Sequence, residues 1–426
     1  MSDRESIQAA GWSADVVIRG AHCATGPGEM QCGDLWISGG RIASIGPSEN
    51  SFVCRAPRHS EVDLSGYLLL PGLINAHDHL EFALYPKLGQ PPYQNYIDWG
   101  EDIHARFADR IAVNHRVPGE VRLGWGGLRN LVCGVTTVCH HNPLYDALRR
   151  PDYPVRVVQE YGWAHSVGLG ANLRAARTAT PAGRPFIVHA CEGTDRRARD
   201  EVELLEEWGI LDEFAVLVHG LALDREGVVL VRNRGASLIL CPSSNFFLFG
   251  VVPDLSLLGA VPRMAIGSDS PLTATGDLLD EFRFAVSMCG TPVHEAYRMV
   301  TSQAAGILRL GNGEGSLRRG GVADLIAVSA EGCEPAERLA VLSMHEVDLV
   351  LIGGAVQLAS EKMLERLPAA AVEGLEPLLI GEAVRWVRAP VSQLLEKAEE
   401  ALGEGQVSLG GRAVHSGVQL EADHAL

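Results

Sequence analysis

The sequence predicts a mixed α/β fold in which a barrel of parallel strands is joined to a small β unit made from both ends of the chain. Residues 14–70 alternate like short strands, and from Leu69 onward apolar runs alternate with helical segments. Strand-like sequence returns after a glycine-rich break at residues 313–321. Alternation of strands and helices is typical of parallel sheets, because neighbouring parallel strands must be connected by a crossover.

The composition suits one large barrel or a few smaller domains. The chain has 426 residues, of which 46% are hydrophobic, and a mean hydropathy of +0.07, as is typical of a protein with a large buried core. No apolar run is long enough to span a bilayer, and the polar start of the chain lacks the apolar segment of a signal peptide. We therefore expect a cytoplasmic protein without a membrane partner.

Charge and cysteine content narrow the classes of partner. The formal net charge is −17, which argues against a surface for nucleic acids or anionic membranes. The nine cysteines are scattered without a CxxC pair, so buried thiols explain them better than disulfides or a zinc ribbon. A small-molecule substrate is compatible with both features.

Both ends of the chain contribute to the predicted small β unit. The segments that alternate like strands are Asp15–Gly20, Asp34–Ser38, Arg41–Gly46, Ala323–Ser329 and Val347–Gly353. We expect residues 1–68 and 315–389 to form one discontinuous domain and residues 69–314 to form the barrel. Residues 390–426 are expected to contain a charged helix at Val391–Leu402 and a glycine-rich tail.

The central region contains apolar runs that predict buried parallel strands. Between two of these runs, Asp195–Trp208 has the charged face of an amphipathic helix. A barrel of this type has eight strands, and we expect the eighth near residues 164–170, unless the barrel is irregular there. The seven strands that we predict directly are Leu73–His79, Val135–His141, Val155–Trp163, Phe186–Glu192, Ala215–His219, Ser237–Cys241 and Met264–Asp269.

His77 and His79 are the first residues that indicate a metal site. One residue separates them at the end of a predicted strand, so their imidazoles share a face while Asp78 points to the other. Two imidazoles on one face are half of a metal site, or they are two incidental histidines. The other strands must supply further ligands for the first interpretation to hold.

Further metal-binding side chains follow the ends of other predicted strands. His189 and Glu192 follow one apolar run, and His219 and Asp269 end two more. Taken singly, each is more often a cap or a surface group. In a parallel barrel, however, all strands open with their carboxyl ends on one face, where active sites lie. Three histidines and one carboxylate suit Zn²⁺ or Fe²⁺ with a position left for water.

An ordered series of motifs carries a resemblance to a known family. Over roughly residues 14–360 the chain resembles the amidohydrolase superfamily, and most of all its mononuclear aminohydrolase branch. That branch includes cytosine, guanine and adenosylhomocysteine deaminases and triazine chlorohydrolases. The motifs are Pro71-Gly-Leu-Ile-Asn-Ala-His77-Asp-His79-Leu, Gly134-Val-Thr-Thr-Val138, His189-Ala-Cys-Glu192, His219-Gly220, Cys241-Pro-Ser-Ser-Asn245, Gly267-Ser-Asp269-Ser and Gly320-Gly-Val-Ala-Asp324-Leu.

The resemblance implies a fold and a set of site residues. The fold would be a distorted (β/α)8 barrel of the TIM type with a small β-sandwich built from both chain ends. A homodimer is also expected, because dimers are common among such relatives. The implied metal ligands are His77, His79, His189 and Asp269, and the implied catalytic groups beside the metal are Glu192, His219 and Asp269.

The lysine content bears on the number of metal ions. Some amidohydrolases bridge two metals with a carboxylated lysine on a middle barrel strand. This chain has no lysine between Lys87 and Lys362, so that bridge is impossible, and a second metal would need another one, such as Glu160 or Cys191. We therefore predict one divalent ion, zinc in the first place and Fe²⁺ as the alternative.

The expected reaction is hydrolytic deamination of a cyclic amidine or nucleobase-like compound. Asp269 would accept a proton from the activated water, Glu192 would protonate the substrate nitrogen, and His219 would orient the nucleophile. An amide or lactam hydrolase and a chlorohydrolase are alternatives on the same site. A catalytically inactive homologue is a second alternative.

Several other residues are candidates for contact with the substrate. Glu81 follows His79 by two positions and should face the same side, while His165 lies on the expected eighth strand. His140 and His141 end a strand, where they line the pocket, bind a second metal or cap the strand. Ser243 and Asn245 are expected to brace the loop near Asp269. An aromatic pocket wall or ordinary core packing explains Tyr93, Tyr96, Trp99 and residues 246–249.

Overall fold

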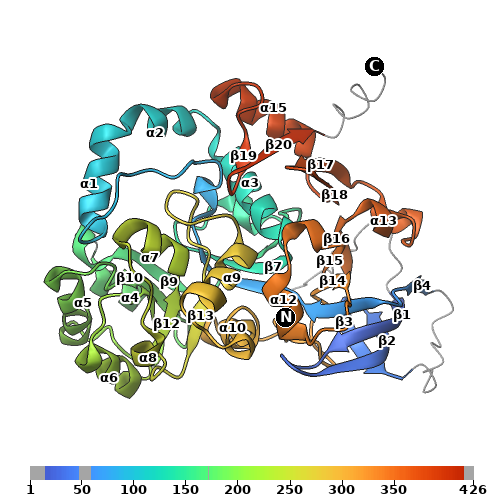
Figure 1. Ribbon diagram of the computed structural model, residues 1–426, viewed down its shortest axis with the longest axis horizontal. Coiled ribbons are helices and arrows are strands. Elements are labelled where there is room, and N and C mark those ends of the chain that lie inside the picture. The colour runs from blue at the N-terminus through green and yellow to red at the C-terminus, as the bar shows by residue number, and fades with distance from the viewer. Residues whose placement is uncertain (1–14, 48–58, 171, 417–426) are drawn as a thin grey trace.

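The computed structural model describes residues 15–47, 59–170 and 172–416. These residues form a mixed α/β fold with a large sheet on one side and parallel strands surrounded by helices on the other (Figure 1). Cys54 and the last ten residues of the predicted tail, 417–426, lie outside the described residues.

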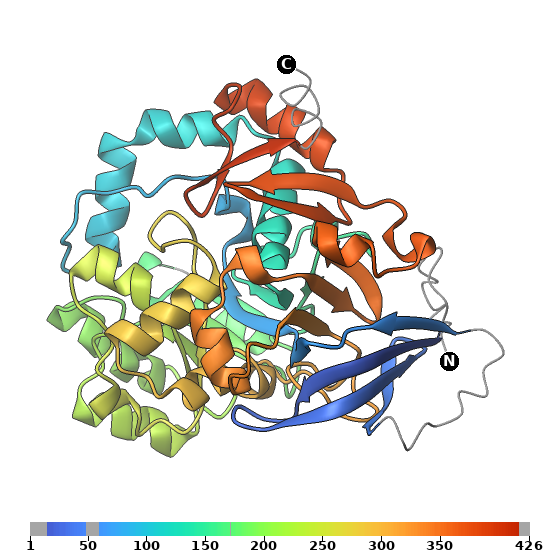
Figure 2. The ribbon, with the colours of Figure 1, turned by 45° about the vertical axis from the view of Figure 1, so that its right-hand side comes forward.

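The large sheet is built from both ends of the chain, and Figure 2 brings it forward on the right. Strand β5 joins the two ends, because it pairs parallel with β1 and antiparallel with β14. The twelve strands of the sheet are β1 (Asp15–Ala24), β2 (Met30–Ser38), β3 (Arg41–Gly46), β4 (Ser60–Asp63), β5 (Tyr67–Pro71), β14 (Leu325–Ser329), β15 (Leu349–Ile352), β16 (Ala355–Ala359), β17 (Glu376–Ile380), β18 (Ala383–Val387), β19 (Ser408–Leu409) and β20 (Arg412–Ser416).

The central strands pair in parallel and form two smaller sheets. An isolated parallel bridge between Asp78 and Asp269 connects the end of β6 to the end of β13. The first sheet contains β6 (Leu73–Asp78), β7 (Val135–His140) and β8 (Arg156–Val157). The second contains β9 (Gly162–Ser166), β10 (Phe186–Ala190), β11 (Ala215–His219), β12 (Ser237–Leu240) and β13 (Met264–Ile266).

The structure corrects the single strand predicted for Val155–Trp163. Two strands occupy this region, and they belong to different sheets, because β8 pairs with β7 whereas β9 pairs with β10. The chain leaves the first sheet at Gln159, whose side-chain amide donates to the carbonyl oxygens of Leu148 and Val157. An apolar run alone could not reveal this change of partner. Strand β9 overlaps the segment in which the eighth strand was expected.

Helices follow most of the parallel strands and pack around them. Aspartates at their N-caps start several of them, for example Asp195 before α5 and Asp277 before α9. The helices are α1 (Tyr96–Arg106), α2 (Ala108–His115), α3 (Gly119–Val132), α4 (Leu173–Ala179), α5 (Arg196–Glu207), α6 (Arg225–Arg234), α7 (Pro242–Phe249), α8 (Leu255–Leu258), α9 (Leu278–Met288), α10 (Val293–Met299), α11 (Ser302–Ile307), α12 (Pro335–Val341), α13 (Glu361–Leu364), α14 (Ala369–Val372) and α15 (Val391–Leu402).

Alternate residues of the parallel strands enter different apolar clusters. Val188 and Leu217 belong to the largest cluster, which also includes helical residues such as Val202. Ile187 and Val216, their neighbours in sequence, belong to a separate cluster. Because side chains alternate across a strand, both faces of these sheets are buried, as expected for parallel strands. The carboxyl ends of the strands are therefore where polar side chains emerge.

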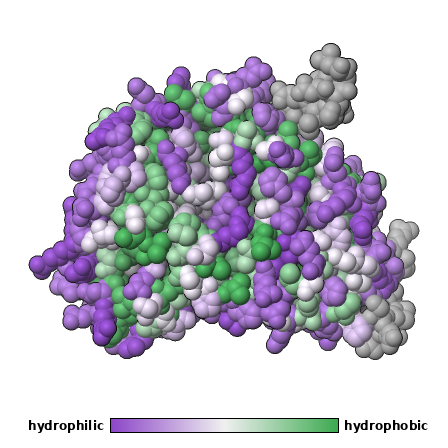
Figure 3. Space-filling view, viewed as in Figure 1, coloured by the Kyte–Doolittle hydropathy of each residue, from purple (hydrophilic) through white to green (hydrophobic). Residues whose placement is uncertain are grey.

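The surface is mostly polar, with apolar side chains gathered over α7 and its surroundings in Figure 3. Phe246 and Met288 are 43% and 52% exposed. Every helix that the structure describes is too short or too polar to cross a membrane. Of the described cysteines, which are all free, Cys32 is exposed.

Candidate metal centre and active-site cavity

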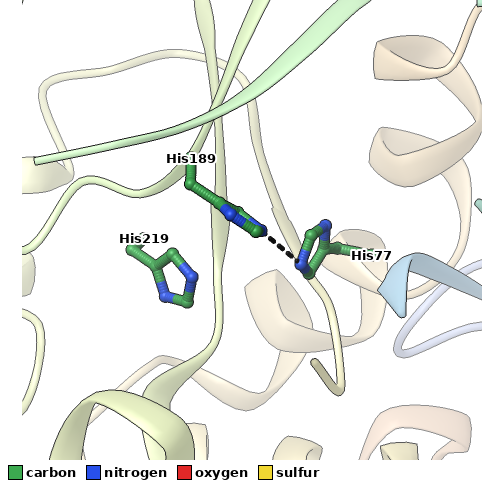
Figure 4. A group of neighbouring side chains, drawn as sticks. All are labelled: His77, His189 and His219. Atoms are coloured by element: carbon green, nitrogen blue, oxygen red, sulfur yellow. Dashed lines mark hydrogen bonds between the residues drawn. The ribbon is translucent and has the colours of Figure 1, made fainter. Parts of the chain in front are cut away.

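The carboxyl ends of four parallel strands bring five metal-binding side chains together. His77 and His79 come from β6, His189 from β10, His219 from β11, and Asp269 follows β13. Figure 4 shows the imidazoles of His77, His189 and His219 converging on one space. The Nε2 atoms of His77 and His189 are 3.1 Å apart.

Asp269 lies between the two histidines of β6 and a pair of hydroxyls. Its Oδ1 is 3.7 Å from His77 Nε2 and 3.6 Å from His79 Nε2. Its Oδ2 accepts hydrogen bonds from Ser244 Oγ at 2.7 Å and Thr273 Oγ1 at 3.1 Å. Burial raises the pKa of Asp269, but the neighbouring histidines outweigh burial and hold the pKa below its usual value. Asp269 is therefore an ionised carboxylate with one oxygen free for a cation.

Left-handed backbone conformations direct some of these side chains. His219 has φ of 75° and Asp269 has φ of 50°, which residues other than glycine rarely adopt. Cys191, directly before Glu192, has φ of 56°. Such conformations cost free energy and cluster at functional sites. In this protein the three residues lie where β10, β11 and β13 end. Glu192, His219 and Asp269, at these strand ends, line the cavity.

The donor set fits a divalent metal ion. Two groups have ligand atoms that lie within 4.8 Å of one another: His77, His189 and His219, and His77, His79 and Asp269. Burial lowers the pKa of His79 and His189 well below the usual value, so both imidazoles are neutral, the form that binds metals. The Nε2 atoms of His77 and His189 face each other. A cation beside them could accept the lone pairs of both nitrogens.

Glu192 and His219 form a second pair beside this group. Glu192 Oε1 is 3.6 Å from His219 Nε2. His219 Nδ1 lies 2.9 Å from Asn245 Oδ1, so Nδ1 carries the proton and Nε2 offers a lone pair. Burial lowers the pKa of His219 to about 4 and, with the charge of Asp269, raises the pKa of Glu192 well above its usual value. Burial therefore favours the protonated form of Glu192 and the neutral form of His219.

These groups line one end of a cavity of about 560 Å³. His79, His189, His219, Glu192 and Asp269 all contribute to its surface. Helices α1 and α2 and their neighbours contribute apolar side chains to the lining, together with the polar residues Glu101, His104 and His115. A cavity of this size, largely apolar with a few convergent polar groups, is typical of a small-molecule site.

Helix α1 is attached to the Glu192 segment by several hydrogen bonds. Tyr96 N donates to the carbonyl oxygen of Glu192 at 3.2 Å. Tyr96 Oη donates to Glu201 Oε1 at 2.8 Å, and the other oxygen of Glu201 accepts from Cys191 N at 2.7 Å. Tyr96 Oη also accepts from Gly168 N at 2.6 Å. One wall of the cavity is therefore tied to the residue that precedes Glu192.

The four residues predicted to contact the substrate lie in different places. His165 lines the cavity and bonds Ser166 Oγ, 2.7 Å from its Nδ1. Glu81, His140 and His141 are buried and are not among the described residues that line it. Asn142 Nδ2 donates to Glu81 at 2.6 Å, and the ring of His141 stacks on His189 with centroids 4.2 Å apart. These three residues surround the candidate ligands.

The other residues predicted from the sequence also divide into those that line the cavity and those that lie outside its lining. Tyr96 and Trp99 line the cavity, whereas Tyr93 donates to Asp102 on α1. Asn245 holds His219, as described above, and Ser243 Oγ accepts from Thr275 N at 3.0 Å. Glu160, considered as a bridge for a second metal, is 65% exposed and pairs with Arg184, unlike the buried groups of the centre.

Sequence reasoning missed several residues that contact the site. Ser244 and Thr273 hold Asp269, Ser166 Oγ lies 3.2 Å from His189 Nδ1, and Tyr85 lines the cavity. Ser244 lies inside the motif Cys241–Asn245, which is the signal that could have found it. Tyr85 has no such signal, because it lies in an irregular segment after the first histidines.

Comparisons with known proteins agree with this arrangement. The model of the amidohydrolase family matches residues 182–356. A 5-methylthioadenosine/S-adenosylhomocysteine deaminase of Syntrophobacter fumaroxidans is 27% identical over 352 residues, which cover 70% of this chain and 80% of that protein. The protein of the same name from Pyrococcus furiosus is 24% identical and covers 70% and 82%.

Solved structures show the same fold. An adenosine deaminase from Xanthomonas campestris with bound zinc has a TM-score of 0.69 at 18% identity and covers 91% of this chain and 97% of its own. Atrazine chlorohydrolase from Arthrobacter aurescens, complexed with zinc, has a TM-score of 0.68 at 17% identity and covers 91% and 99%. The motif series, the family match and the relatives agree in one respect: this chain is similar to the amidohydrolase family over residues 182–356 and to these deaminases over most of its length.

Proposed function

We propose that this protein uses a divalent metal ion to deaminate a nucleoside-like small molecule by hydrolysis. The observation that carries the proposal is the convergence of Glu192, His219 and Asp269 on one cavity, with Glu192 Oε1 3.6 Å from His219 Nε2 and Asp269 Oδ1 3.6 Å from His79 Nε2. Burial raises the pKa of Glu192, whereas the neighbouring histidines hold the pKa of Asp269 below its usual value. Two carboxyl groups whose pKa values are shifted apart in this way suit a reaction that adds one proton to the substrate and removes another from water.

We propose His77, His79, His189 and Asp269 as the metal ligands and zinc as the metal. Zinc is supported by its presence in the two solved relatives described above. When bound, the ion would lower the pKa of a water molecule and act as a Lewis acid. The nitrogen of His219 lies close enough to be an alternative ligand. We assign it to the attacking water instead, because its Nε2 also faces Glu192.

Each side chain then has a defined task with its own proton. Asp269 accepts a proton from the attacking water, while Ser244 and Thr273 donate hydrogen bonds to its Oδ2. His219 accepts a hydrogen bond at Nε2 and orients that water, since Asn245 fixes its tautomer. Glu192 donates its proton to a ring nitrogen of the substrate, which makes the neighbouring carbon easier to attack. The amino group then leaves as ammonia with the proton that Asp269 accepted, and the hydroxyl proton of the adduct returns to Glu192.

The substrate class follows from the relatives and from the cavity. The curated relatives are named as deaminases of 5-methylthioadenosine and S-adenosylhomocysteine, and one solved relative is an adenosine deaminase. An aminated purine nucleoside presents a ring nitrogen next to the carbon that bears the amino group, which matches the positions of Glu192 and Asp269. The cavity of about 560 Å³ leaves room for more than the base.

A chlorohydrolase is the alternative that a specific observation favours. The solved atrazine chlorohydrolase has a TM-score of 0.68, close to the 0.69 of the adenosine deaminase. The ligand set is neutral between the two reactions, since they differ in the leaving group. Release of ammonia or of chloride from matched aminated and chlorinated purines separates them. An amide or lactam hydrolase is tested by including cyclic amides in the same panel.

We also propose that β6 to β13 form a distorted (β/α)8 barrel. The parallel pairing within the two small sheets and the bridge between Asp78 and Asp269 support this proposal. We propose residues 69–314 as the barrel domain, residues 1–68 and 315–389 as a discontinuous β-sandwich domain, and residues 390–426 as a C-terminal helix and tail. Strands β19 and β20 of this tail belong to the large sheet through the pairing of β20 with β17. A homodimer stays a prediction, which sedimentation can test.

The decisive experiment compares wild type with Glu192→Gln. Wild type should release ammonia from adenine nucleosides and contain one metal ion per chain. The Glu192→Gln variant should lose activity by about a hundredfold or more and keep its metal content. Glu160→Gln, at an exposed ion pair, should retain both. Full activity of the Glu192→Gln variant would remove Glu192 as the acid, and absence of metal in wild type would revive an inactive homologue.

A further inference from the structure

Six apolar side chains contribute to the lining of the cavity beside the candidate metal centre. We call this set the apolar wall, and it consists of Phe82, Ile97, Trp99, Ile103, Ile111 and Leu272. Trp99 donates its ring N–H to the carbonyl oxygen of Leu88 at 2.9 Å. Its only polar atom is therefore used, and the indole offers apolar surface to the cavity.

The apolar wall is a small core of its own. Ile103 and Leu272 cluster with Tyr85 and Leu88 separately from the larger cores, and Phe82, Trp99 and Ile111 pack against them while only partly buried. Their remaining exposure is toward the cavity that they line. Apolar surface held open in this way gains free energy when a ligand covers it.

The charged side chains that line the cavity are acidic. Glu101, Glu192 and Asp269 contribute to its surface, and among the lining residues that the structure describes there is neither lysine nor arginine. The nearest cation on α1, Arg106, is 2.7 Å from Asp102 and does not line the cavity. A carboxylate on the substrate would therefore lose its hydration without gaining a cation, which is costly.

Tyr85 adds a hydroxyl to the polar groups that line the cavity near the apolar wall, which also include Glu101, His104 and His115. Tyr85 is 5% exposed and lines the cavity, and its hydroxyl has no hydrogen-bond partner among the described residues. Burial raises the pKa of Tyr85, so the hydroxyl keeps its proton. Buried hydroxyls are nearly always hydrogen-bonded, and an acceptor on a ligand in the cavity would give this buried donor a partner.

We propose that the substrate carries an uncharged, largely apolar substituent that packs on the apolar wall and accepts a hydrogen bond from Tyr85, and that substituents bearing a carboxylate are rejected. This inference rests on the proposed function, because it names the part of the substrate that lies away from the reacting amino group. The inference is narrower than the names of the curated relatives, which include two substrates. One of the two, S-adenosylhomocysteine, carries an amino-acid carboxylate.

Two probes that share base and ribose test the inference. They are 5′-deoxy-5′-methylthioadenosine, which is neutral, and its 5′-carboxymethylthio counterpart. Equilibrium binding is measured on metal-loaded Glu192→Gln, so the result does not depend on turnover, and ammonia release is measured on wild type. We expect the neutral probe to bind at least tenfold more tightly, since each factor of ten corresponds to about 1.4 kcal/mol.

A charge placed on the apolar wall provides the reciprocal test. In an Ile111→Arg background the ratio of the two affinities should shift by about tenfold or more toward the carboxylate probe. The matched control is Ala112→Arg, one residue along α2 and exposed, which should leave the ratio unchanged. Tyr85→Phe should weaken binding of the neutral probe by about threefold to tenfold and leave the unfolding midpoint near that of wild type.

The outcomes separate this inference from the proposed function. Equal affinities, tighter binding of the carboxylate probe, or failure of the neutral probe to bind would overturn the inference about the substituent. Binding with the expected preference but without ammonia release from wild type would overturn deamination and leave the inference standing.

Discussion

Arg129 of α3 forms a buried ion pair with Asp78, with 3.2 Å between Nη1 and Oδ1. Asp78 stands between His77 and His79, and its other oxygen accepts from Asn130 Nδ2 at 2.7 Å. The same guanidinium donates to the carbonyl oxygens of Ser268 and Asp269 at 3.4 and 3.3 Å. One side chain therefore links the ends of the two strands that supply His77, His79 and Asp269.

Replacing Arg129 should weaken both folding and metal binding. In Arg129→Met the carboxylate of Asp78 stays buried without its cation, which costs about 3–5 kcal/mol, and the strand ends lose their common support. Metal affinity should fall by about tenfold to a hundredfold. Urea unfolding and competition with a chelator measure the two effects.

The control for this prediction is an exposed ion pair of similar geometry. Arg150 pairs with Asp152 at 2.6 Å, with both side chains more than half exposed. Such pairs contribute little, because water screens them. Arg150→Met should therefore keep the urea midpoint and the metal affinity of wild type. Equal destabilisation in the two variants would show that Arg129 does not support the centre.

Ser244 should matter for metal affinity more than for folding. Its hydroxyl donates to Asp269 Oδ2 at 2.7 Å and lies 2.8 Å from Thr273 Oγ1, so it turns the other carboxylate oxygen toward the histidines. In Ser244→Ala we expect about tenfold weaker metal binding, measured by chelator competition. Ser243→Ala is the matched control, because Ser243 Oγ contacts Thr275 N instead. Unchanged affinity in Ser244→Ala would contradict the prediction.

Tyr96 should influence catalysis through Glu201. In Tyr96→Phe, Glu201 Oε1 and Gly168 N both lose their partner, which should cost about 1–3 kcal/mol. Because Glu201 also holds Cys191 N, the neighbouring Glu192 should be less well placed and kcat should fall. Steady-state kinetics and thermal unfolding measure the two effects.

The control lies on the same segment. Tyr93 also donates to a carboxylate, Asp102, at 2.6 Å, but it has no contact with Glu201. Tyr93→Phe should therefore keep kcat. A positioning role for Tyr96 also requires that Tyr96→Phe and Glu201→Gln be non-additive in kcat, since the two residues act through one hydrogen bond. Additive losses would contradict it.

The convergence of strand-end residues could be predicted because each ends an apolar run. His189, His219 and Asp269 follow runs that are short enough for strands, and parallel strands open on one face. The structure brings these side chains together with His77 and His79, while their roles as ligands stay predictions. Periodicity is a local signal, so it reports where a strand ends and which face a residue takes.

The supporting contacts could not be predicted, because they depend on tertiary packing. Arg129 and Tyr96 lie on helices whose polar residues usually face solvent, and nothing local indicates that their partners are Asp78 and Glu201. The division of the predicted strand Val155–Trp163 has the same origin. Its residues are apolar enough for one strand, and the choice between β7 and β10 as partner is made by the whole sheet arrangement.

Glu281 should give the stability of this protein a dependence on pH. Burial raises the pKa of Glu281 to about 8, and Ser243 N donates to its Oε1 and Oε2 at 2.9 and 3.3 Å. Because the folded pKa lies above the unfolded value of 4.5, the folded state keeps a proton that the unfolded state releases. The contribution to stability is full below pH 4.5 and is lost as the pH rises through 8, by about 5 kcal/mol in total.

Glu281→Gln should remove this slope. The amide oxygen of glutamine can accept from Ser243 N, and the side chain has no proton to release in this range. We therefore expect the free energy of unfolding of wild type to fall relative to that of Glu281→Gln between pH 5 and pH 8 and the difference to level off above pH 8. Urea unfolding at several pH values measures it, with Glu160→Gln as the exposed control. Parallel pH profiles for wild type and Glu281→Gln would mean that Glu281 is ionised in the folded protein.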